Sequence, residues 1–535
     1  MNREFNLIDE PWIRVINSEF ETEDVSLRTV FERAHLYRAL AGELEAQNVA
    51  VLRMLLALLY SVFIRYDTEG CEDEITEADE AVDRWRELWN LKKFPIAAIN
   101  RYLDAYYDRF WLIDDKRPFY QIQEANVGTF NSAAKLNGVI AESNNKVRMF
   151  SERAGSEKDI LTYAEAARWL LYINSFDDTA SKPKGKNLPS PGAGWLGKLG
   201  LILAQGDNFH KTLLLNLVFL QDGRRLWDSV EVSDGKCACW ELDLPRKQER
   251  TEIRMPTNLP ALYTLQSRRI KLKEENGAVS GYCLLGGDFF SRENAFNEQM
   301  TMWRMKQEKE RTFFIPRRHD PSRQIWREFS TITEMTEEMH RPGIVSWLHF
   351  LHKANILADK DRIDLQIVSV QYGDKDFFVT DAYSDNLSFH SQLLDEIGEV
   401  WRVWVKNEIA LCDKCAYCVK GLAEDLKKAT GDSGDVSGSN YQEQFYTQID
   451  PIFREWLVRL NPRAHEENYV LELRKSVKKT ALVLGRKMVE ETGQAAFRGR
   501  YVQEGKGNSI LKKHYSSPEA YNRFLYNINA IYGRS

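Results

Sequence analysis

Cysteine is scarce in this sequence, and long hydrophobic runs are absent. Seven cysteines, an odd number mostly scattered along 535 residues, do not make the disulfide framework of a small secreted protein. No uninterrupted apolar run reaches the roughly 18–20 residues that span a bilayer, and the longest candidate lies around Met54–Ile64. The first residues lead into a strand-like segment without a signal-peptide core. We therefore expect a cytoplasmic protein with no membrane partner.

Positive charge is not in excess either. Lysine and arginine number 73 against 79 aspartates and glutamates, which gives a formal net charge of −6. This balance provides no general attraction to nucleic acid, although the distribution along the chain still permits local basic patches. Residues 67–87 are strongly acidic and residues 465–515 are basic. Solvated helix faces would produce the same pattern.

Signatures of catalysis are also lacking. The nine histidines are widely dispersed, and no nucleophile–base arrangement stands out. The segment Gly192–Lys198 matches G-x-G-x-x-G and nearly matches the Walker pattern. However, a proline-rich loop precedes it, strand-like Leu199–Ala204 follows it, and leucine occupies the position of the magnesium-binding hydroxyl. The sequence therefore indicates a non-enzymatic protein, with a nucleotide-dependent enzyme using this loop as the alternative.

One cysteine cluster keeps a second enzymatic alternative open. Cys412, Cys415 and Cys418 have a spacing that could ligate zinc or an iron–sulfur cluster if a fourth ligand lay nearby. They lie in a segment with a helical pattern, where the same spacing places three thiols along one face, as in a helix core. We expect core cysteines and no bound metal or other cofactor.

The periodicity of apolar residues predicts an α+β protein. Ala46–Tyr66 and Ala78–Leu91 are predicted helices, Thr162 and Glu165 form a capping box that opens another, and Leu365–Tyr372 is a predicted strand. We expect a mixed α/β domain over residues 1–380 and a four-helix bundle over residues 381–535. The expected helical stretches of the bundle are 389–428, 440–461, 465–493 and 508–532.

Three segments combine cations with residues suited to nucleic-acid contact. The first is Asn144–Phe150, the second is the lysine- and glycine-containing segment Ser181–Asn187, and the third is the strip Arg268–Lys273. Phosphate contact needs such cations, and a glycine lets backbone approach a groove closely. Solvated loops are the alternative for each segment.

Several sequence segments, in a fixed order along the chain, resemble the CasA family, the large subunit of the type I-E CRISPR Cascade surveillance complex. They are FNLIDEPWI at 5–13, LAGELEAQNVAVLRMLLALL at 40–59, YLDAYYDRFWLIDDKRPFYQ at 102–121, and the glycine-rich 192–200 leading to TLLLNLVFL at 212–220. The resemblance covers the chain in outline. It implies a mixed α/β N-terminal domain, a helical-bundle tail and no catalysis.

The resemblance also implies a function and a set of partners. A CasA-like subunit recognises a protospacer-adjacent motif in double-stranded DNA, assists duplex opening and R-loop formation, and recruits a helicase–nuclease. The implied partners are the CRISPR guide RNA, double-stranded target DNA, the helicase–nuclease and the backbone, small and handle-binding Cascade subunits. Protein then reads a short duplex motif, while base pairing reads the rest of the sequence.

Transferred by position, the resemblance suggests specific contact residues. The implied guide-RNA or complex contacts are Asn145, Lys146, Arg148 and Phe150. The implied DNA-binding residues are Lys182, Lys184, Gly185 and Lys186 of the glycine loop, Asp374, Lys375, Asp376 and Phe377 of a duplex wedge, Arg292, and the basic strip at Arg268 and Arg269. The wedge departs from the family pattern, because acids and a phenylalanine stand where relatives can present a glutamine.

Overall fold

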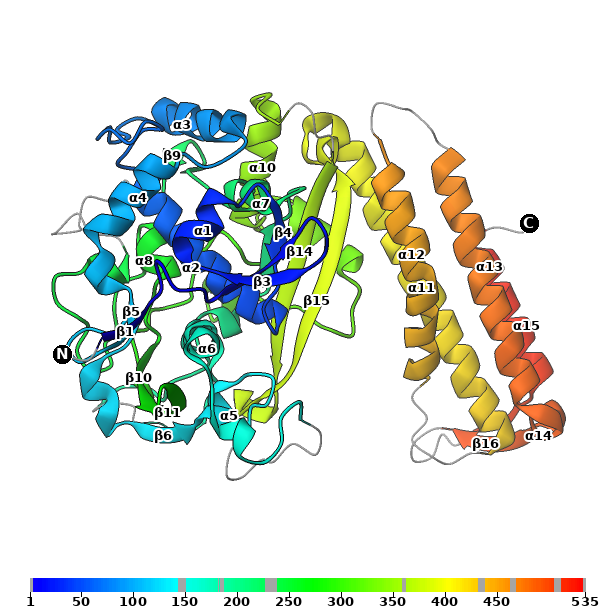
Figure 1. The fold of residues 1–535 in the computed structure, drawn as a ribbon. Coiled ribbons are helices and arrows are strands. Elements are labelled where there is room, and N and C mark those ends of the chain that lie inside the picture. Colours follow the sequence, from blue (N-terminus) through cyan, green and yellow to red (C-terminus); the bar gives the residue numbers. More distant parts are fainter. Residues whose placement is uncertain are drawn as a thin grey trace. The chain divides into compact units, whose positions relative to one another are not determined.

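A computed structural model of the protein describes residues 3–142, 151–180, 182, 187–226, 238–357, 362–431, 438–461, 468–504 and 511–532 (Figure 1). The chain separates into two compact units. Unit 1 comprises Met1–His319, Glu334–Leu357 and Asp364–Asn386, and unit 2 comprises Asp320–Thr333, Ala358–Ile363 and Leu387–Ser535. Helices and strands are mixed throughout unit 1, and long helices dominate unit 2. The predicted α+β class is confirmed.

Helix α2 (Glu45–Phe63) forms the centre of unit 1. It is long and apolar enough to cross a membrane, but nearly all of its side chains are buried within the protein. It packs against α6 (Tyr163–Phe176) and α8 (Leu259–Tyr263). Leucine, valine and alanine on every face explain this position, because a helix that is hydrophobic all round is stable only inside a core.

A buried ion pair lies in the same core. Both Arg53 guanidinium nitrogens bind the carboxylate of Glu298, at 2.7 and 2.9 Å, and neither side chain is more than 1% exposed. The indole nitrogen of Trp195 donates to the same carboxylate at 2.8 Å. The ring centroid of Tyr263 lies 4.0 Å from the guanidinium carbon. These contacts pair the two buried charges and give the carboxylate a further donor, as buried charges require.

The remaining helices of unit 1 surround this core. Their bounds are α1 (Leu27–Glu32), α3 (Ala78–Leu91), α4 (Ile96–Ala105), α5 (Ala133–Leu136), α7 (Phe209–Leu215) and α10 (Gly343–Lys353). Helix α3 has the predicted bounds, and Trp85 lies on its buried face. The predicted capping box is also present: Thr162 and Glu165 exchange hydrogen bonds at the start of α6.

Short antiparallel strands make up the sheets of unit 1. Three strands form β3-β2-β4, three form β10-β11-β6, and three form β15-β14-β7, while β1-β5, β8-β9 and β12-β13 are two-stranded. The bounds are β1 (Arg3–Asn6), β2 (Ile13–Asn17), β3 (Thr22–Val25), β4 (Tyr37–Leu40), β5 (Trp111–Asp114), β6 (Thr129–Ser132), β7 (Leu201–Ala204), β8 (Leu220–Gln221), β9 (Arg224–Arg225), β10 (Arg268–Glu275), β11 (Ala278–Gly286), β12 (Trp303–Glu308) and β13 (Arg311–Pro316).

The β14–β15 hairpin carries the candidate site at its tip. Strand β14 (Arg362–Tyr372) contains the predicted strand Leu365–Tyr372, and β15 (Val379–His390) returns beside it (Figure 1). β14 pairs with β7, so that Leu365 faces Ala204. Strand β7 follows the glycine-rich loop, and the hairpin is therefore anchored directly to that loop.

The described residues of unit 2 include four long helices. They are α11 (Glu399–Thr430), α12 (Ser439–Arg459), α13 (Asn468–Glu491) and α15 (Ser517–Tyr532), with the short helices α9 (Phe329–Thr333) and α14 (Gly493–Arg498). Helix α11 contacts α12, α13 and α15, and α13 contacts α12 and α15. The predicted helical C-terminal region is therefore confirmed.

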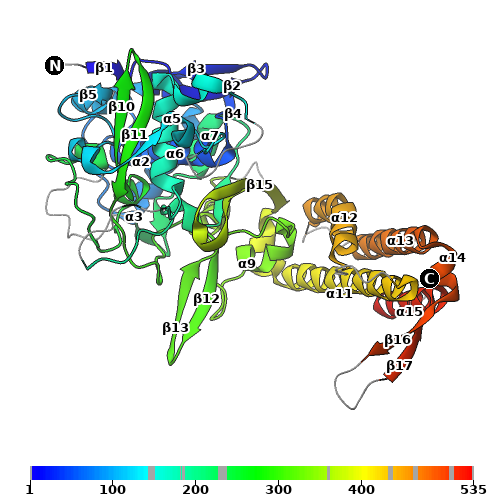
Figure 2. The same ribbon diagram turned by 90° about the horizontal axis from the view of Figure 1, so that it is seen from below.

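The predicted helix over 508–532 was wrong in its first part. Strands β16 (Arg500–Glu504) and β17 (Leu511–Tyr515) form an antiparallel hairpin, and helix α15 begins only at Ser517 (Figure 2). A proline occupies the second position of α15, where its missing N–H would have no helical partner. The proline therefore marks the start of α15 in the sequence, whereas no nearby residue marks the pairing of β16 with β17.

Candidate nucleic-acid interface

The tip of the β14–β15 hairpin is a turn fixed to the segment that follows α6. Lys375 and Asp376 both have left-handed backbone conformations, with φ values of 56° and 58°. Their carbonyl groups accept hydrogen bonds from Thr179: its hydroxyl donates to Lys375 at 2.8 Å, and its N–H donates to Asp376 at 2.9 Å. Non-glycine residues adopt this conformation when surrounding contacts hold them. The two hydrogen bonds from Thr179 therefore hold the backbone of the turn in place.

A single arginine joins this tip to the glycine-rich loop. Arg318 makes a bidentate ion pair with Asp376, at 2.6 and 2.9 Å, and donates to the carbonyl of Gly197 at 2.5 Å. Its guanidinium carbon lies 4.6 Å from the ring centroid of Tyr372. The Tyr372 hydroxyl in turn donates to the carbonyl of Phe176 at the end of α6. Three segments that are distant in sequence thus meet at one point.

The outer side of the tip remains accessible. Asp374 and Lys375 are exposed, and Phe377 has 51% of its surface exposed. The rings of Phe377 and Phe378 are edge-to-face, with centroids 5.9 Å apart. An accessible aromatic on an anchored turn has the chemistry needed to stack on a base. Because Arg318 neutralises Asp376, only Asp374 presents an acidic side chain to the outside of the tip.

Lys182 does not face solvent, which corrects the expectation of a cationic contact at this position. Its ammonium lies 2.9 Å from the carboxylate of Asp177 and donates to the carbonyls of Asp178 and Ala180. Arg268 binds the same carboxylate. Burial opposes ionisation, but the charges of Lys182 and Arg268 outweigh it and hold the pKa of Asp177 below its ordinary value. Lys182 therefore fixes the start of the loop.

The exposed basic strip expected at Arg268 and Arg269 is also corrected. Both residues are buried in β10, at 4% and 1% exposure. Arg269 pairs with Asp288 at 2.5 Å and donates to the carbonyl of Gln266, while Arg268 pairs with Asp177. Both acids are distant from their partners in the sequence. Buried guanidinium groups need such counter-charges, and they are not available for a duplex.

Arg292 is exposed, in the loop after β11. It lies close enough to Lys198 for its charge to lower the pKa of that ammonium. The remaining predicted contacts lie outside the described residues. They are Lys184, Gly185 and Lys186 of the glycine loop and Asn145, Lys146, Arg148 and Phe150 of the guide-contacting segment.

Packing explains two of the three glycines in the Gly192–Lys198 pattern. A Cβ at Gly194 would overlap the carbonyl of Ser175, and a Cβ at Gly197 would overlap the hydroxyl of Tyr372. The loop ends in a single 3₁₀ turn, and strand β7 follows it. The loop therefore lacks the strand-to-helix context of a dinucleotide fingerprint, as the sequence indicated.

The cysteine cluster lies apart, on helix α11 of unit 2. Cys412 and Cys415 are buried, and Cys418 is partly buried. Burial raises the pKa of Cys412 to about 12 and raises that of Cys415 well above its ordinary value. In the part of the chain that the structure describes, no three potential ligands are grouped to hold a metal. The environment therefore favours protonated thiols that pack against the other helices.

The sequence interpretation missed the residues that organise the interface. Neither Arg318 nor Thr179 was among the predicted contact residues. The adjacent arginines at 317 and 318 are a weak signal, because two neighbouring cations after a strand need acceptors. No sequence spacing connects Arg318 to Asp376, 58 residues later.

Comparisons with known proteins identify the family of this chain. The family model of CRISPR-associated protein Cse1 matches residues 6–484. A CRISPR-associated protein CasA/Cse1 of Thermus thermophilus is 27% identical over 335 residues, which is 61% of this chain and 60% of the relative's length. The crystal structure of Thermobifida fusca Cse1 is 26% identical, covers 99% of this chain and 98% of its own, and has a TM-score of 0.80.

A chain of a CRISPR RNA-guided surveillance complex shares the fold. It is 15% identical, covers 92% of this chain and 99% of its own, and has a TM-score of 0.65. The family model covers most of the sequence, and the fold likeness covers both units. The chain therefore belongs to the Cse1 (CasA) family of CRISPR-associated proteins.

Proposed function

We propose that this chain is the large, non-catalytic subunit of a type I-E CRISPR Cascade complex acting in the cytoplasm. Family membership and the fold shared with a chain of an RNA-guided surveillance complex support this role. Its partners are the guide RNA, the backbone, small and handle-binding subunits, double-stranded DNA and a helicase–nuclease. The helices of unit 2 act as a four-helix bundle that contacts neighbouring subunits.

Within the complex, the chain recognises a protospacer-adjacent motif and helps to open the duplex beside it. The observation that carries this proposal is the hairpin tip: Phe377 is accessible on a turn that Thr179 and Arg318 hold from two sides. To separate two stacked base pairs, an inserted side chain must keep its position against the stacking energy of the duplex. An aromatic ring on an anchored turn meets that requirement, and it can stack on the base that it separates.

The glycine loop supplies the motif contact in this proposal. Lys182, at its start, is held by Asp177, and the cations Lys184 and Lys186 follow it in the sequence. Minor-groove edges carry a degenerate donor and acceptor pattern, and a loop that reads them accepts related motifs. Arg292, exposed nearby, adds a phosphate or groove contact.

Reconstitution tests this proposal. The other Cascade subunits and guide RNA are assembled with and without this chain, and R-loop formation is measured on target duplexes with varied flanking motifs. We expect motif-dependent opening only when the chain is present. Equal opening without the chain would refute the recognition role and leave a scaffold.

A second measurement addresses the loop. Lys184→Ala combined with Lys186→Ala should weaken duplex binding and reduce the slope of log affinity against log salt by about one unit for each lost phosphate contact. The matched control is Lys92→Ala combined with Lys93→Ala, because these adjacent lysines are exposed after α3. An unchanged slope in the loop variant would contradict the glycine-loop assignment.

A further inference from the structure

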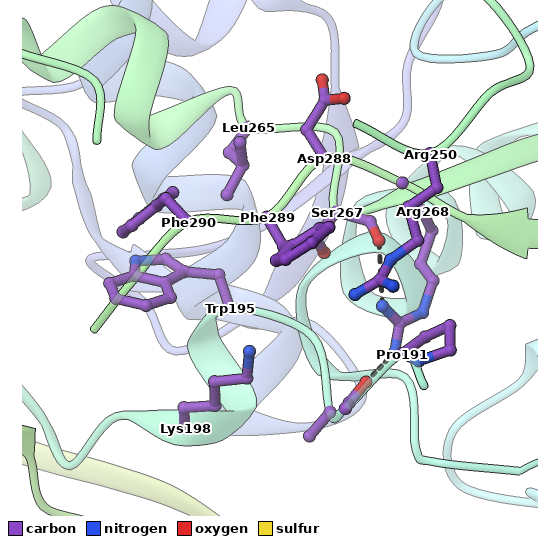
Figure 3. A pocket seen from close by; sticks show the side chains of 13 residues that line it. Pro191, Trp195, Lys198, Arg250, Leu265, Ser267, Arg268, Asp288, Phe289 and Phe290 are labelled. Carbon is purple, nitrogen blue, oxygen red and sulfur yellow. Dashed lines mark hydrogen bonds between the residues drawn. The ribbon is translucent and has the colours of Figure 1, made fainter. Parts of the chain in front are cut away.

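A pocket in unit 1 lies beside the glycine-rich loop, on the side away from the packed glycines. Its walls include Trp195 and Lys198 from that loop, Arg250 and Arg268, and Asp288 and Phe289 after β11 (Figure 3). The two aromatic rings and three cationic side chains face one space. Such a combination of apolar walls and a few convergent polar groups is typical of a ligand site.

The cations of this pocket differ in how they are satisfied. Arg268 binds Asp177 and donates to the carbonyl of Gly192 at 2.7 Å. Arg250 donates to the carbonyl of Pro189, and its guanidinium carbon lies 3.9 Å from the ring centroid of Phe289. The ammonium of Lys198 has no hydrogen bond or ion pair with any described residue, and Figure 3 shows it pointing into the pocket.

No carboxylate compensates this ammonium. Asp288 is the only acid among the lining residues, all of which are described, and its carboxylate points away from Lys198 in Figure 3. Arg269 holds it at 2.5 Å, with Arg246 at 3.6 Å. Burial and the charges of Arg268, Arg292, Arg250 and Arg318 together lower the pKa of Lys198 to about 8. The pocket is therefore electropositive.

We propose that this pocket binds a phosphate group, with Lys198 as its principal ligand and Arg250 completing the contact. A compact ammonium provides a point charge, and the guanidinium group provides a planar fork that matches phosphate oxygens. An anion in this space would give Lys198 the acceptor that the protein does not supply. Phosphate fits this donor set better than a carboxylate does, because it presents more acceptor oxygens to two separate cations.

The phosphate group has two possible sources, inorganic phosphate or a phosphodiester of bound nucleic acid. Lys198 directly follows Gly197, whose carbonyl receives Arg318, so the pocket shares its loop with the anchored hairpin tip. This neighbourhood favours a backbone phosphate of the duplex held at the tip. That choice of source rests on the proposed function, whereas the phosphate site itself does not.

Lysine reactivity in the full-length protein tests the site. The protein is briefly treated with a limiting amount of acetic anhydride at pH 8, in sodium phosphate or in sodium chloride of equal ionic strength, and acetylation of each lysine is measured by mass spectrometry. We expect phosphate to slow acetylation of Lys198 at least threefold, and to leave exposed Lys92 unchanged. Equal acetylation of Lys198 in both salts would overturn the proposal.

Two variants make the test specific. Arg250→Gln should reduce the protection of Lys198 by phosphate, whereas Arg224→Gln, the same change at an exposed arginine of β9, should retain it. Lys198→Met should fold with a thermal midpoint at or above that of the wild type without phosphate, because it removes an uncompensated cation. It should also lose the rise in midpoint that phosphate gives the wild type. Full protection in Arg250→Gln, or an undiminished phosphate-induced rise in Lys198→Met, would overturn the proposal.

A short target duplex replaces phosphate in a further arm and distinguishes the sources. Protection by duplex as well as by phosphate assigns the site to a nucleic-acid phosphate. Protection by phosphate alone keeps the site and assigns it to the free anion. Failure of motif-dependent R-loop formation together with protection by phosphate would refute the proposed function and leave the site standing.

Discussion

Arg318 grips the carboxylate of Asp376 through both of its terminal nitrogens, although 58 residues separate the two in the sequence. The pair closes the turn of the β14–β15 hairpin onto the carbonyl of Gly197. About a third of each side chain is exposed, so solvent screens the attraction. The ion pair therefore contributes more to the position of the tip than to the stability of the protein.

Asp376→Asn should reveal this positional role. We expect the free energy of unfolding to fall by about 1 kcal/mol or less, since partly exposed ion pairs are worth little, and R-loop formation to fall more than stability would explain. Urea unfolding and R-loop assays on the reconstituted complex measure both. Asp374→Asn is the control, because that carboxylate is exposed. An equal loss of opening in the two variants would show that net charge matters, and not the tie to Arg318.

Phe377→Ala should impair duplex opening without unfolding the protein. Because half of its surface is exposed, we expect a stability change within about 0.5 kcal/mol. Opening is followed by the fluorescence of 2-aminopurine placed in the first base pairs of the target. Phe130→Ala, a comparably exposed aromatic on β6, is the matched control. Normal unstacking in Phe377→Ala would exclude this ring as the wedge.

Removing one member of the buried pair should strongly destabilise unit 1. Arg53→Met leaves the carboxylate of Glu298 without a counter-charge, with the indole of Trp195 and the N–H of Met300 as donors, and we expect a loss of about 3–5 kcal/mol. Arg53→Met combined with Glu298→Leu should lose less than the sum of the single changes. Chemical denaturation of the three variants gives the coupling. Additive losses would mean that the two charges do not depend on each other.

Acid should destabilise the protein partly through His210. Burial lowers the pKa of His210 to about 4, so between this pH and its ordinary 6.5 the unfolded chain binds a proton that the folded chain does not. The free energy of unfolding therefore falls as pH decreases through this window, by about 1 kcal/mol per pH unit. His210→Phe, next to Phe94, should flatten thermal stability between pH 6.5 and 4, and His514→Gln should not. An unchanged slope in His210→Phe would assign the acid loss elsewhere.

Chelation should leave the protein intact if the cysteines of α11 are core residues. We expect a zinc and iron chelator not to change the thermal midpoint, and purified protein to contain no stoichiometric metal. Cys415→Ser should lose about 1–3 kcal/mol because it buries a hydroxyl without a partner, and partly buried Cys418→Ser should lose less. A metal that is released as the protein melts would restore the enzymatic alternative.

The sequence predicted those elements whose formation depends on residues close to one another along the chain. The capping box at Thr162, the all-apolar composition of α2 and the amphipathic pattern of α3 each depend on residues within a few positions of one another. The β16–β17 hairpin was missed because the pairing of Arg500 with Tyr515 depends on a partner 15 positions away, and a charged five-residue strand has no strong period of its own.

The candidate site shows the same division. The exposed turn at Phe377 was predicted by position, because the resemblance placed it after a recognisable strand. The burial of Lys182, Arg268 and Arg269 was not predicted, because a run of cations looks the same whether or not acids meet it in the fold. Asp177 and Asp288 decide between the two outcomes, and only the folded chain brings them to the arginines.

The glycines of the loop before β7 give the nucleotide-like pattern another meaning. At Gly194 and Gly197 the chain passes so close to the end of α6 and to Tyr372 that no methyl group fits. A search for glycine spacing alone therefore mistakes this close packing for a phosphate-binding loop. Glycine is required both where a ligand approaches the backbone and where two parts of the same chain pack closely. The two cases can be distinguished only by what occupies the space where a Cβ would lie.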